Sequence, residues 1–397
     1  MRSLRLLALL LLAGIYGVPG ASADEAARRS SLQALYNSGD VNAERFAQSF
    51  LDQVPAARLS IVLRQLKTTY GAASRVSGED GKYVLWTGRY RIPVQFTHDP
   101  RGRIVGLFFK PGIVLAQRIR TVTDLLDRLP GQSAYLIVKN GTPLAARDAD
   151  RALAVGSAFK LAVLFALRRT VESGDRAWSS VIRIAAPDRS LPSGILQNFP
   201  SDAPVTLHTA AALMIAKSDN TATDTLIRTL GRSAVEAVAG LMPLLTTREF
   251  FQLKADRDLY ARYVRADLKQ RRRILSSLAG RALPAGGQAF TALQEHVEWH
   301  IPLNRLCRWM GQLHDLDVMH INPGVADPSR WKRVAYKGGS EIGVINLTTW
   351  LSDSSGNSYC IATTWNDAKP LDRQRMFQIY ASLIDVVRRR HTSYAKP

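Results

Sequence analysis

Cysteine is almost absent from this chain. Only Cys307 and Cys360 occur among 397 residues, which excludes a disulfide framework as the main source of stability, although one disulfide can form in an oxidising compartment. Their spacing is not that of a metal site. The fold therefore depends on apolar cores, and a hydrophobic content of 46% is ample for them.

Long hydrophobic runs are also missing, apart from one at the amino terminus. Arg2 and Arg5 flank an apolar run, Leu6 to Leu12, and small residues follow up to Ala23. This is the pattern of a secretory signal peptide, and the run is shorter than the roughly 20 residues of a spanning helix. We expect cleavage near Ala23 and a periplasmic or secreted product without a lipid anchor or stable membrane insertion; an uncleaved anchor is the alternative.

Acidic residues are scarce relative to basic ones. The chain has 53 Lys and Arg against 33 Asp and Glu, a net charge of +20. Such a charge favours anionic surroundings. The basic residues are dispersed except at Arg271–Arg273 and Arg388–Arg390, which are typical of helix faces or ends, so no nucleic acid partner is expected. Cell-wall polymers, anionic headgroups or carboxylate-bearing substrates fit an exported protein better.

Length and patterning predict two domains of α+β class, since the chain after residue 23 exceeds the roughly 250–300 residues that one core usually serves. Residues 24–118 predict a small α+β accessory domain, with helices over Ala43–Gln53 and Ala56–Tyr70 followed by strands. In residues 119–397, strands at both ends enclose helices. We therefore expect one antiparallel sheet, completed by distant segments, beside a helical region.

The first of three polar clusters is Ser157-Ala-Phe-Lys160, which follows Gly156 and opens an apolar helix over Ala158–Arg168. Residues three apart on a helix share a face, so the two side chains lie within reach. Burial lowers the pKa of an amine, and a neutral lysine can accept the serine proton. Ser-x-x-Lys also occurs at Ser329 and Lys332, where nothing around it supports catalysis, so the context carries the prediction.

The second cluster is Ser218-Asp219-Asn220, between two predicted helices. Ser218 can relay a proton to a leaving group. The Asn220 amide can hold both a substrate carbonyl and the lysine head, while Asp219 braces the loop. These residue types also favour helix N-caps, so an ordinary cap is the alternative.

The third cluster is Lys337-Gly338-Gly339-Ser340, after a predicted strand. Glycines there let a substrate lie along the strand edge, facing backbone N–H groups. The amides of Ser157 and Ser340 are candidate oxyanion donors, and Lys337 is a cation for a substrate carboxylate or a partner for Ser218. The alternative is a glycine-rich hairpin turn.

In this order the three clusters resemble the Ser-x-x-Lys, Ser-Asp-Asn and Lys-Thr/Ser-Gly elements of the serine β-lactamase and penicillin-binding-protein family, class A in particular. The resemblance spans roughly Ala134–Val387. It implies catalytic roles for four residues: Ser157 as acylated nucleophile, Lys160 as base, Ser218 as proton donor and Lys337 as cation. It further implies substrate binding by Asn220, Gly338, Gly339 and Ser340. No metal and no other cofactor is expected. The amino-terminal module resembles the nuclear-transport-factor-like or cystatin-like extension of some β-lactamase-like esterases.

Two departures from that family affect the expected activity. Gly338 stands where the family has Thr or Ser, although Ser340 can compensate. The Glu-x-x-Leu-Asn motif that positions the deacylating water in class A is missing. Glu249 is the carboxylate in the corresponding region; we expect it in a surface salt bridge, and substitution for the missing glutamate is the alternative. Slow hydrolysis of an acyl-enzyme follows.

Three functions remain open. The leading one is an exported serine hydrolase acting on a small-molecule β-lactam or a related ester or amide. The alternatives are a D-Ala-D-Ala peptidase or transpeptidase on cell-wall peptide, and a catalytically weak sensor that binds a β-lactam or another ligand.

Overall fold

The computed structural model describes residues 22–285 and 293–392. The chain divides into two units, residues 1–110 and 111–397, and each has apolar cores of its own. Nearly all of the expected signal peptide lies outside the described residues. Within the described ranges no helix is long and apolar enough to cross a membrane.

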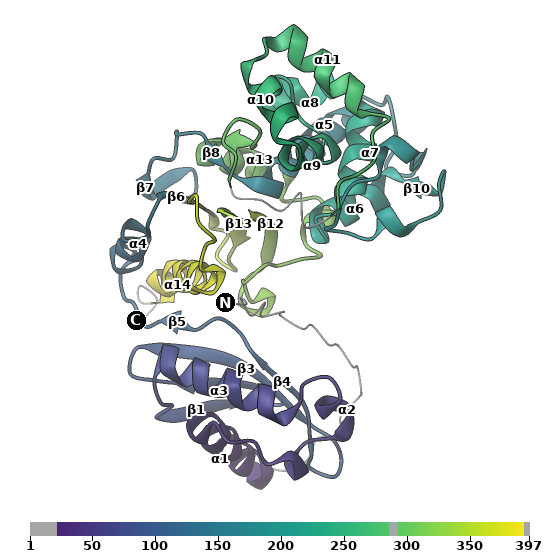
Figure 1. The fold of residues 1–397 in the computed structure, drawn as a ribbon. Coiled ribbons are helices and arrows are strands. Elements are labelled where there is room, and N and C mark those ends of the chain that lie inside the picture. Colours follow the sequence, from purple (N-terminus) through teal and green to yellow (C-terminus); the bar gives the residue numbers. More distant parts are fainter. Residues whose placement is uncertain (1–21, 286–292, 393–397) are drawn as a thin grey trace. The chain divides into compact units, whose positions relative to one another are not determined.

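The first unit packs helices on four antiparallel strands (Figure 1). Its helices are α1 (Ser22–Ser38), the 3-10 turn η1 (Ala43–Arg45), α2 (Gln48–Leu51) and α3 (Ala56–Tyr70); its strands, in spatial order, are β1 (Arg75–Glu79), β2 (Lys82–Trp86), β3 (Tyr90–His98) and β4 (Ile104–Phe109). Leu32, Tyr36 and Leu63 on the helices pack against Tyr83 and Phe96 on the strands.

Two features of this unit differ from expectation. Helix α1 was not predicted, and the helix expected over Ala43–Gln53 is split into η1 and α2. The split has a backbone cause: Phe46 and Ala47 are extended, and the Ala47 amide donates to the Ile104 carbonyl at 2.9 Å. Pairing with a distant strand has replaced local helical hydrogen bonds.

The second unit is built on a five-stranded antiparallel sheet of order β12-β13-β14-β6-β7. The strands are β12 (Arg333–Glu341), β13 (Val344–Ser352), β14 (Ser358–Asn366), β6 (Gln132–Lys139) and β7 (Thr142–Arg147). The expected hairpin joins β6 to β7, with Asn140 at φ 47° and Gly141 at φ 82°. The predicted fold class is confirmed: segments distant in the chain complete one antiparallel sheet flanked by helices.

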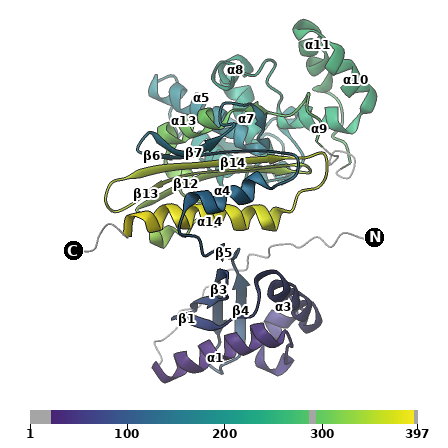
Figure 2. The same cartoon turned by 90° about the vertical axis from the view of Figure 1, so that its left-hand side faces the viewer.

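Helices cover both faces of this sheet, as Figures 1 and 2 show. On one face lie α4 (Ile119–Asp127) and α14 (Arg373–Thr392), whose apolar side chains share a core with the strands. The other face carries the helical region: α5 (Lys160–Glu172), α6 (Leu207–Ala216), α7 (Asn220–Leu230), α8 (Arg232–Ala239), α9 (Thr247–Ala255), α10 (Arg257–Arg265), α11 (Leu268–Leu278) and α13 (Leu303–Leu313).

Short elements connect these layers. The strands are β5 (Ile113–Val114), β8 (Leu153–Ala154), β9 (Val181–Arg183), β10 (Pro204–Thr206) and β11 (His300–Ile301), and the 3-10 turns are η2 (Gly156–Phe159), η3 (Ala186–Asp188), η4 (Leu196–Asn198), η5 (Asp317–Met319) and η6 (Pro328–Arg330). β8 pairs with β11, and η2 follows β8 directly. This arrangement delivers the Ser-x-x-Lys segment beside the sheet.

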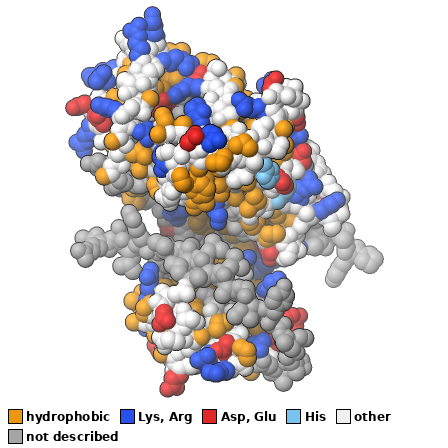
Figure 3. All heavy atoms as spheres, turned by 90° about the vertical axis from the view of Figure 1, so that its right-hand side faces the viewer, with side chains coloured by type: hydrophobic (Ala, Val, Ile, Leu, Met, Phe, Trp, Pro, Cys, Tyr) orange, Lys and Arg blue, Asp and Glu red, His pale blue; other side chains and the backbone are white. Residues whose placement is uncertain are grey.

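The two cysteines form a disulfide, Cys307–Cys360, which joins α13 to β14. It ties the helical region to a central strand of the sheet. On the face that Figure 3 shows, the Lys and Arg side chains are spread among apolar, neutral and acidic ones.

Candidate functional site

The Ser-x-x-Lys segment begins with a 3-10 turn. Ser157 lies within η2, and α5 begins only at Lys160, two residues later than the predicted helix start. The turn is pressed against strand β12. A Cβ built on Gly339 would lie 2.1 Å from the Val155 carbonyl oxygen and 2.5 Å from the Ser157 amide nitrogen. Only glycine fits there, so Gly339 lets the strand approach the Ser157 backbone.

The Lys160 side chain is fully buried and joins the first cluster to the second. Its Nζ lies 2.7 Å from the Ser218 carbonyl oxygen, 2.6 Å from Asn220 Oδ1 and 3.2 Å from Ser218 Oγ. Burial, followed by the positive charge of Lys337, holds the pKa of Lys160 well below its ordinary value. A neutral amine has two N–H donors and one lone pair, which suits two carbonyl acceptors and one hydroxyl donor.

Ser218 lies between two lysines. Its hydroxyl is also 3.1 Å from Lys337 Nζ, which donates in addition to the Gly338 carbonyl at 2.6 Å. Burial lowers the pKa of Lys337 to about 7. Ser218 itself has φ 53°, a strained region for a non-glycine residue. Because a neutral Lys160 amine has a lone pair, the Ser218 hydroxyl can donate to Lys160 while it accepts from Lys337. This arrangement forms a continuous route for a proton.

Asp219 and Asn220 combine a helix cap with contacts to the candidate site. Asp219 is the N-cap of α7, with Oδ1 accepting from the Ala222 amide at 2.8 Å. Its Oδ2 accepts from the amides of Ile195 and Leu196 at 2.6 and 2.9 Å. Asn220 holds the lysine head through its Oδ1. The cap alternative is correct for Asp219, and it fixes the loop that presents its neighbours.

Sequence analysis missed the loop at residues 190–195. Ser193 Oγ donates to the Ser218 carbonyl at 2.6 Å, and the Leu191 carbonyl accepts from Asn220 Nδ2 at 2.9 Å. Gly194, at φ 107°, packs so tightly that a Cβ there would lie 2.2 Å from Asp219 Cγ. A Pro192-Ser193-Gly194 run is typical of any turn, so no local signal tied this loop to the site.

The Lys-Gly-Gly-Ser cluster lies within strand β12, so the hairpin-turn alternative is wrong. Gly338 pairs with Leu347 and Ser340 with Ile345 of β13. A Cβ on Gly156 would lie 3.3 Å from the Ser340 amide nitrogen, which puts that amide beside the turn that carries Ser157. The two amides expected to form an oxyanion hole thus lie at one junction of η2 and β12.

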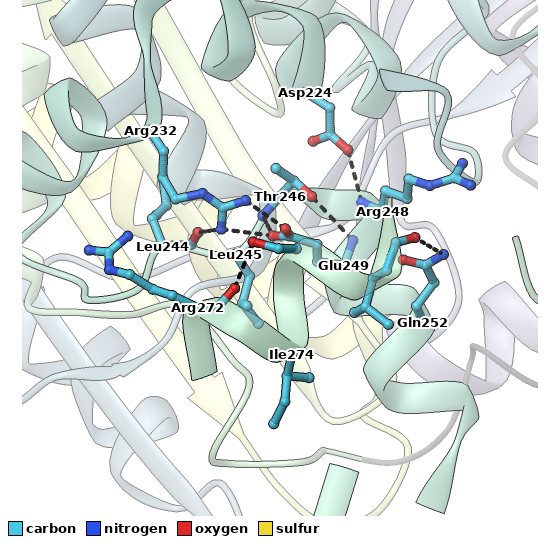
Figure 4. A network of polar contacts seen from close by, with 12 residues as sticks. Asp224, Arg232, Leu244, Leu245, Thr246, Arg248, Glu249, Gln252, Arg272 and Ile274 are labelled. Carbon is cyan, nitrogen blue, oxygen red and sulfur yellow. Dashed lines mark hydrogen bonds and ion pairs between the residues drawn. The ribbon is translucent and has the colours of Figure 1, made fainter. Parts of the chain in front are cut away.

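The carboxylate of Glu249 makes structural contacts. Its carboxylate takes two hydrogen bonds from the Arg232 guanidinium, at 2.5 and 2.9 Å, and one from the Thr246 amide at 2.9 Å in a capping box (Figure 4). Glu249 is only 7% exposed. The expected salt bridge is present, but its place on the surface was wrong: it is buried.

The start of α9 is anchored by a second carboxylate. Asp224 accepts from the amides of Thr247 and Arg248 at 2.7 and 2.8 Å, and the latter contact is drawn in Figure 4. Burial raises the pKa of Asp224 to about 7. In the described part of the chain no three His, Cys, Asp or Glu side chains are grouped to hold a metal.

The comparisons with known proteins agree with this geometry. Residues 115–282 match the model of the beta-lactamase enzyme family. The match supports a domain similar to those of serine β-lactamases and penicillin-binding proteins in this part of the chain. Because the match begins at residue 115, the resemblance of the amino-terminal module to nuclear-transport-factor-like or cystatin-like extensions stays a prediction. None of the curated proteins matches the chain.

The solved structures to which the chain is similar are distant in sequence. A beta-lactamase from Sphaerobacter thermophilus is 19% identical and covers 70% of this chain and 97% of its own, with a TM-score of 0.45. PBP-A is 16% identical with the same coverages and TM-score. A beta-lactamase from Chitinophaga pinensis is 16% identical over 68% of this chain and 98% of its own, with a TM-score of 0.49.

Proposed function

We propose that this chain is an exported serine hydrolase that forms an acyl-enzyme at Ser157 with β-lactams or with related esters and amides. The observation that carries the proposal is the hydrogen-bonded series Lys160, Ser218, Lys337 beside the Ser157 turn. A neutral buried lysine supplies a base without requiring high pH. The two amides at the η2–β12 junction supply donors for the negative charge that develops on the carbonyl oxygen.

The acylation step balances through these residues. Ser157 Oγ attacks the carbonyl carbon, and its proton passes to the Lys160 amine. The C–N bond of a β-lactam, or the C–O bond of an ester, then breaks. Ser218 gives its hydroxyl proton to the leaving atom and recovers one from Lys160, so the lysine ends neutral and Ser157 ends as an ester.

Deacylation is the slow step of this proposal. Glu249, the carboxylate in the region that corresponds to the class A glutamate, is held by Arg232 and Thr246 and is not free to position a water. The engagement of Glu249 also favours a second candidate function, a D-Ala-D-Ala peptidase or transpeptidase on cell-wall peptide, for which slow attack by water is expected. A ligand-binding sensor would share the slow step and differ in releasing no product.

Product release separates these functions. The purified protein is mixed with a penicillin, a 3′-acyloxy cephalosporin and a D-Ala-D-Ala peptide, and products are counted per enzyme by chromatography and mass spectrometry. Several turnovers of a β-lactam or of the side-chain ester, without release of D-Ala, support the hydrolase. Release of D-Ala from the peptide would favour the peptidase. An adduct without product would favour the sensor.

A further inference from the structure

A buried cluster of three charged side chains lies at the end of strand β12. Lys254 of α9 donates to Glu298 Oε1 at 3.1 Å and to Glu341 Oε2 at 2.8 Å. The side chains of Lys254 and Glu298 are 0% exposed, and that of Glu341 is 13% exposed. One cation therefore faces two carboxylates in a place that is almost closed to solvent.

The hydrogen bonds of this cluster are incomplete unless it holds a proton. Glu298 Oε2 and Glu341 Oε1 are buried, and neither accepts a hydrogen bond from a donor in the described residues. Two carboxylates within hydrogen-bonding reach of each other cannot both ionise beside a single lysine without a large penalty. A proton between them supplies the missing donor and leaves one negative charge for Lys254.

The electrostatics of the cluster agree with a shared proton. Burial, followed by the hydrogen bond and the charge of Glu341, raises the pKa of Glu298 well above its ordinary value. Burial opposes the charge of Lys254, but the two carboxylates outweigh it and raise the pKa of the amine. In the described part of the chain, Lys254 of α9 and Glu341 of β12 are the charged groups that act on Glu298.

Glu341 fixes the end of strand β12 beside the site. It is the last residue of β12 and lies on the same face as Gly339, which is packed against the Ser157 backbone. Ser340, whose amide is a candidate oxyanion donor, lies between these two points. Strand β13 pairs with only one edge of β12, so the contact at Glu341 restrains the strand independently of the sheet.

Glu298 and Lys254 belong to the other side of the same junction. Trp299, the residue after Glu298, accepts from the Val155 amide at 3.0 Å and stacks on Phe159 of η2, with the ring centroids 4.1 Å apart. The segment that carries Glu298 therefore supports the turn that carries Ser157. The cluster ties this segment to β12.

We propose that Glu298 and Glu341 share one proton and, together with Lys254, form a clamp that holds the Ser340 amide at the oxyanion hole. The three are positioning residues, because they act on the reacting carbonyl only through backbone amides. The inference rests on the proposed function of the site, acylation of Ser157. It adds that the geometry of this step depends on a buried group of charges outside the three sequence clusters.

The test measures acylation of full-length protein at pH 7 by a penicillin and by its carboxylate methyl ester, using intact-protein mass spectrometry. Glu298→Leu removes the contacts to Lys254 and Glu341. We expect the maximal acylation rate to fall about a hundredfold. Both compounds should be affected equally, because both need the oxyanion hole, and the concentration that gives half of the maximal rate should not change.

A conservative variant separates the contacts from the charge. Glu298→Gln keeps an acceptor for Lys254 and places an amide donor where the shared proton lies. We therefore expect it to keep at least about half of the wild-type rate. A Glu298→Gln protein as slow as Glu298→Leu would contradict the proposal.

Glu236→Leu is the matched control. Glu236 is also a buried carboxylate, paired with Arg272 at 2.8 Å, but it lies on α8 outside the site. Its loss should lower the urea midpoint of unfolding and leave the acylation rate unchanged. A Glu298→Leu protein that loses no more rate than Glu236→Leu would show that the cluster only stabilises the fold.

The shared proton has a test of its own, which also serves if Glu298→Leu does not fold. In the unfolded chain Glu298 loses its proton near its ordinary pKa of about 4.3, whereas in the folded chain it keeps the proton to higher pH. Wild type therefore loses stability as the pH rises through this interval, and Glu298→Gln does not. We expect the urea midpoint of wild type, relative to that of Glu298→Gln, to fall between about pH 5 and about pH 8. A constant difference would rule out the shared proton.

Failure of the inference differs from failure of the proposed function. If wild type forms no adduct with either compound, acylation at Ser157 is rejected and the inference falls with it. If wild type and Glu298→Leu form both adducts at the same rates, acylation stands and only the clamp is rejected.

Discussion

At the scale of residues, the main feature is one serine hydroxyl between two buried amines. Two ammonium groups this close repel each other, and burial penalises each charge. Both effects lower the pKa of Lys160, while burial alone brings that of Lys337 to about 7. The pair is therefore set up so that Lys160 acts as the neutral base and Lys337 retains part of its charge near neutral pH.

These shifts predict the pH dependence of acylation. The rate should fall as the pH drops through the pKa of Lys160, which burial and the charge of Lys337 hold well below the ordinary value of a lysine. Above about 7, Lys337 loses its proton, so acylation by a carboxylate-bearing penicillin should decline while acylation by its methyl ester should not. Stopped-flow rates from pH 4 to pH 10 give this profile. A penicillin rate that keeps rising to the alkaline end would contradict it.

Glu249 gives a second prediction at this scale. Glu249→Gln keeps a side chain suited to the capping box but leaves Arg232 without its carboxylate. We expect a loss of about 3 kcal/mol in the free energy of unfolding, the low end for a broken buried pair, since Arg232 is partly exposed. Deacylation of the folded protein should be unchanged.

The measurement for Glu249 has two parts, urea unfolding and decay of the acyl-enzyme mass. A deacylating base would show the reverse pattern, with a persistent adduct and nearly normal stability. That pattern would overturn the structural role of Glu249.

At the scale of elements, strand β12 and turn η2 determine the geometry of the site. Their contact is backbone on backbone at Gly339, with no side chain between. Lys337 points from the same strand into the site, and Gly338 and Ser340 present its opposite face. A shift of β12 would therefore move the Lys337 cation and the Ser340 oxyanion donor together.

Gly339→Ala tests that contact. The new Cβ would lie 2.1 Å from a carbonyl oxygen and 2.5 Å from the Ser157 amide, so the turn and strand must separate. Misplacement of this order costs about a hundredfold in rate, and we expect acylation to fall by at least that much. Gly311→Ala is the control, since nothing lies within 4 Å of a Cβ there, and it should acylate normally.

The sequence analysis succeeded where the signal was local. The Asn140-Gly141 hairpin follows from a short pattern, and so do the strands at both ends of residues 119–397 that complete the sheet. It failed where a distant partner decides the outcome. Burial of Glu249 depends on Arg232 from another helix, and the break in the helix over Ala43–Gln53 depends on β4.

At the scale of the whole molecule, the second unit joins two cores through one sheet. The helical region and the α4–α14 layer share the strands between them. The disulfide between Cys307 and Cys360 crosses from the helical region to β14. The site lies where the helical region meets the edge strand β12. Its geometry therefore depends on the packing of the helical region against the sheet, although the disulfide is not part of the site.

Removal of the disulfide should therefore affect stability more than chemistry. For Cys307→Ser with Cys360→Ser we expect the unfolding free energy to fall by about 2–4 kcal/mol, the typical contribution of a crosslink to the unfolded chain. Acylation at 25 °C should stay close to wild type. Urea denaturation and adduct formation check the two parts, and an inactive but equally stable variant would contradict the expectation.

The central claim is that Ser157 becomes acylated, and intact-protein mass spectrometry after mixing with a penicillin tests it most directly. Wild type and Ser329→Ala, which alters another Ser-x-x-Lys sequence at η6, should gain the mass of the penicillin. Ser157→Ala should gain none. An adduct that persists in Ser157→Ala, or one that is lost in Ser329→Ala, would place the nucleophile elsewhere and contradict the account.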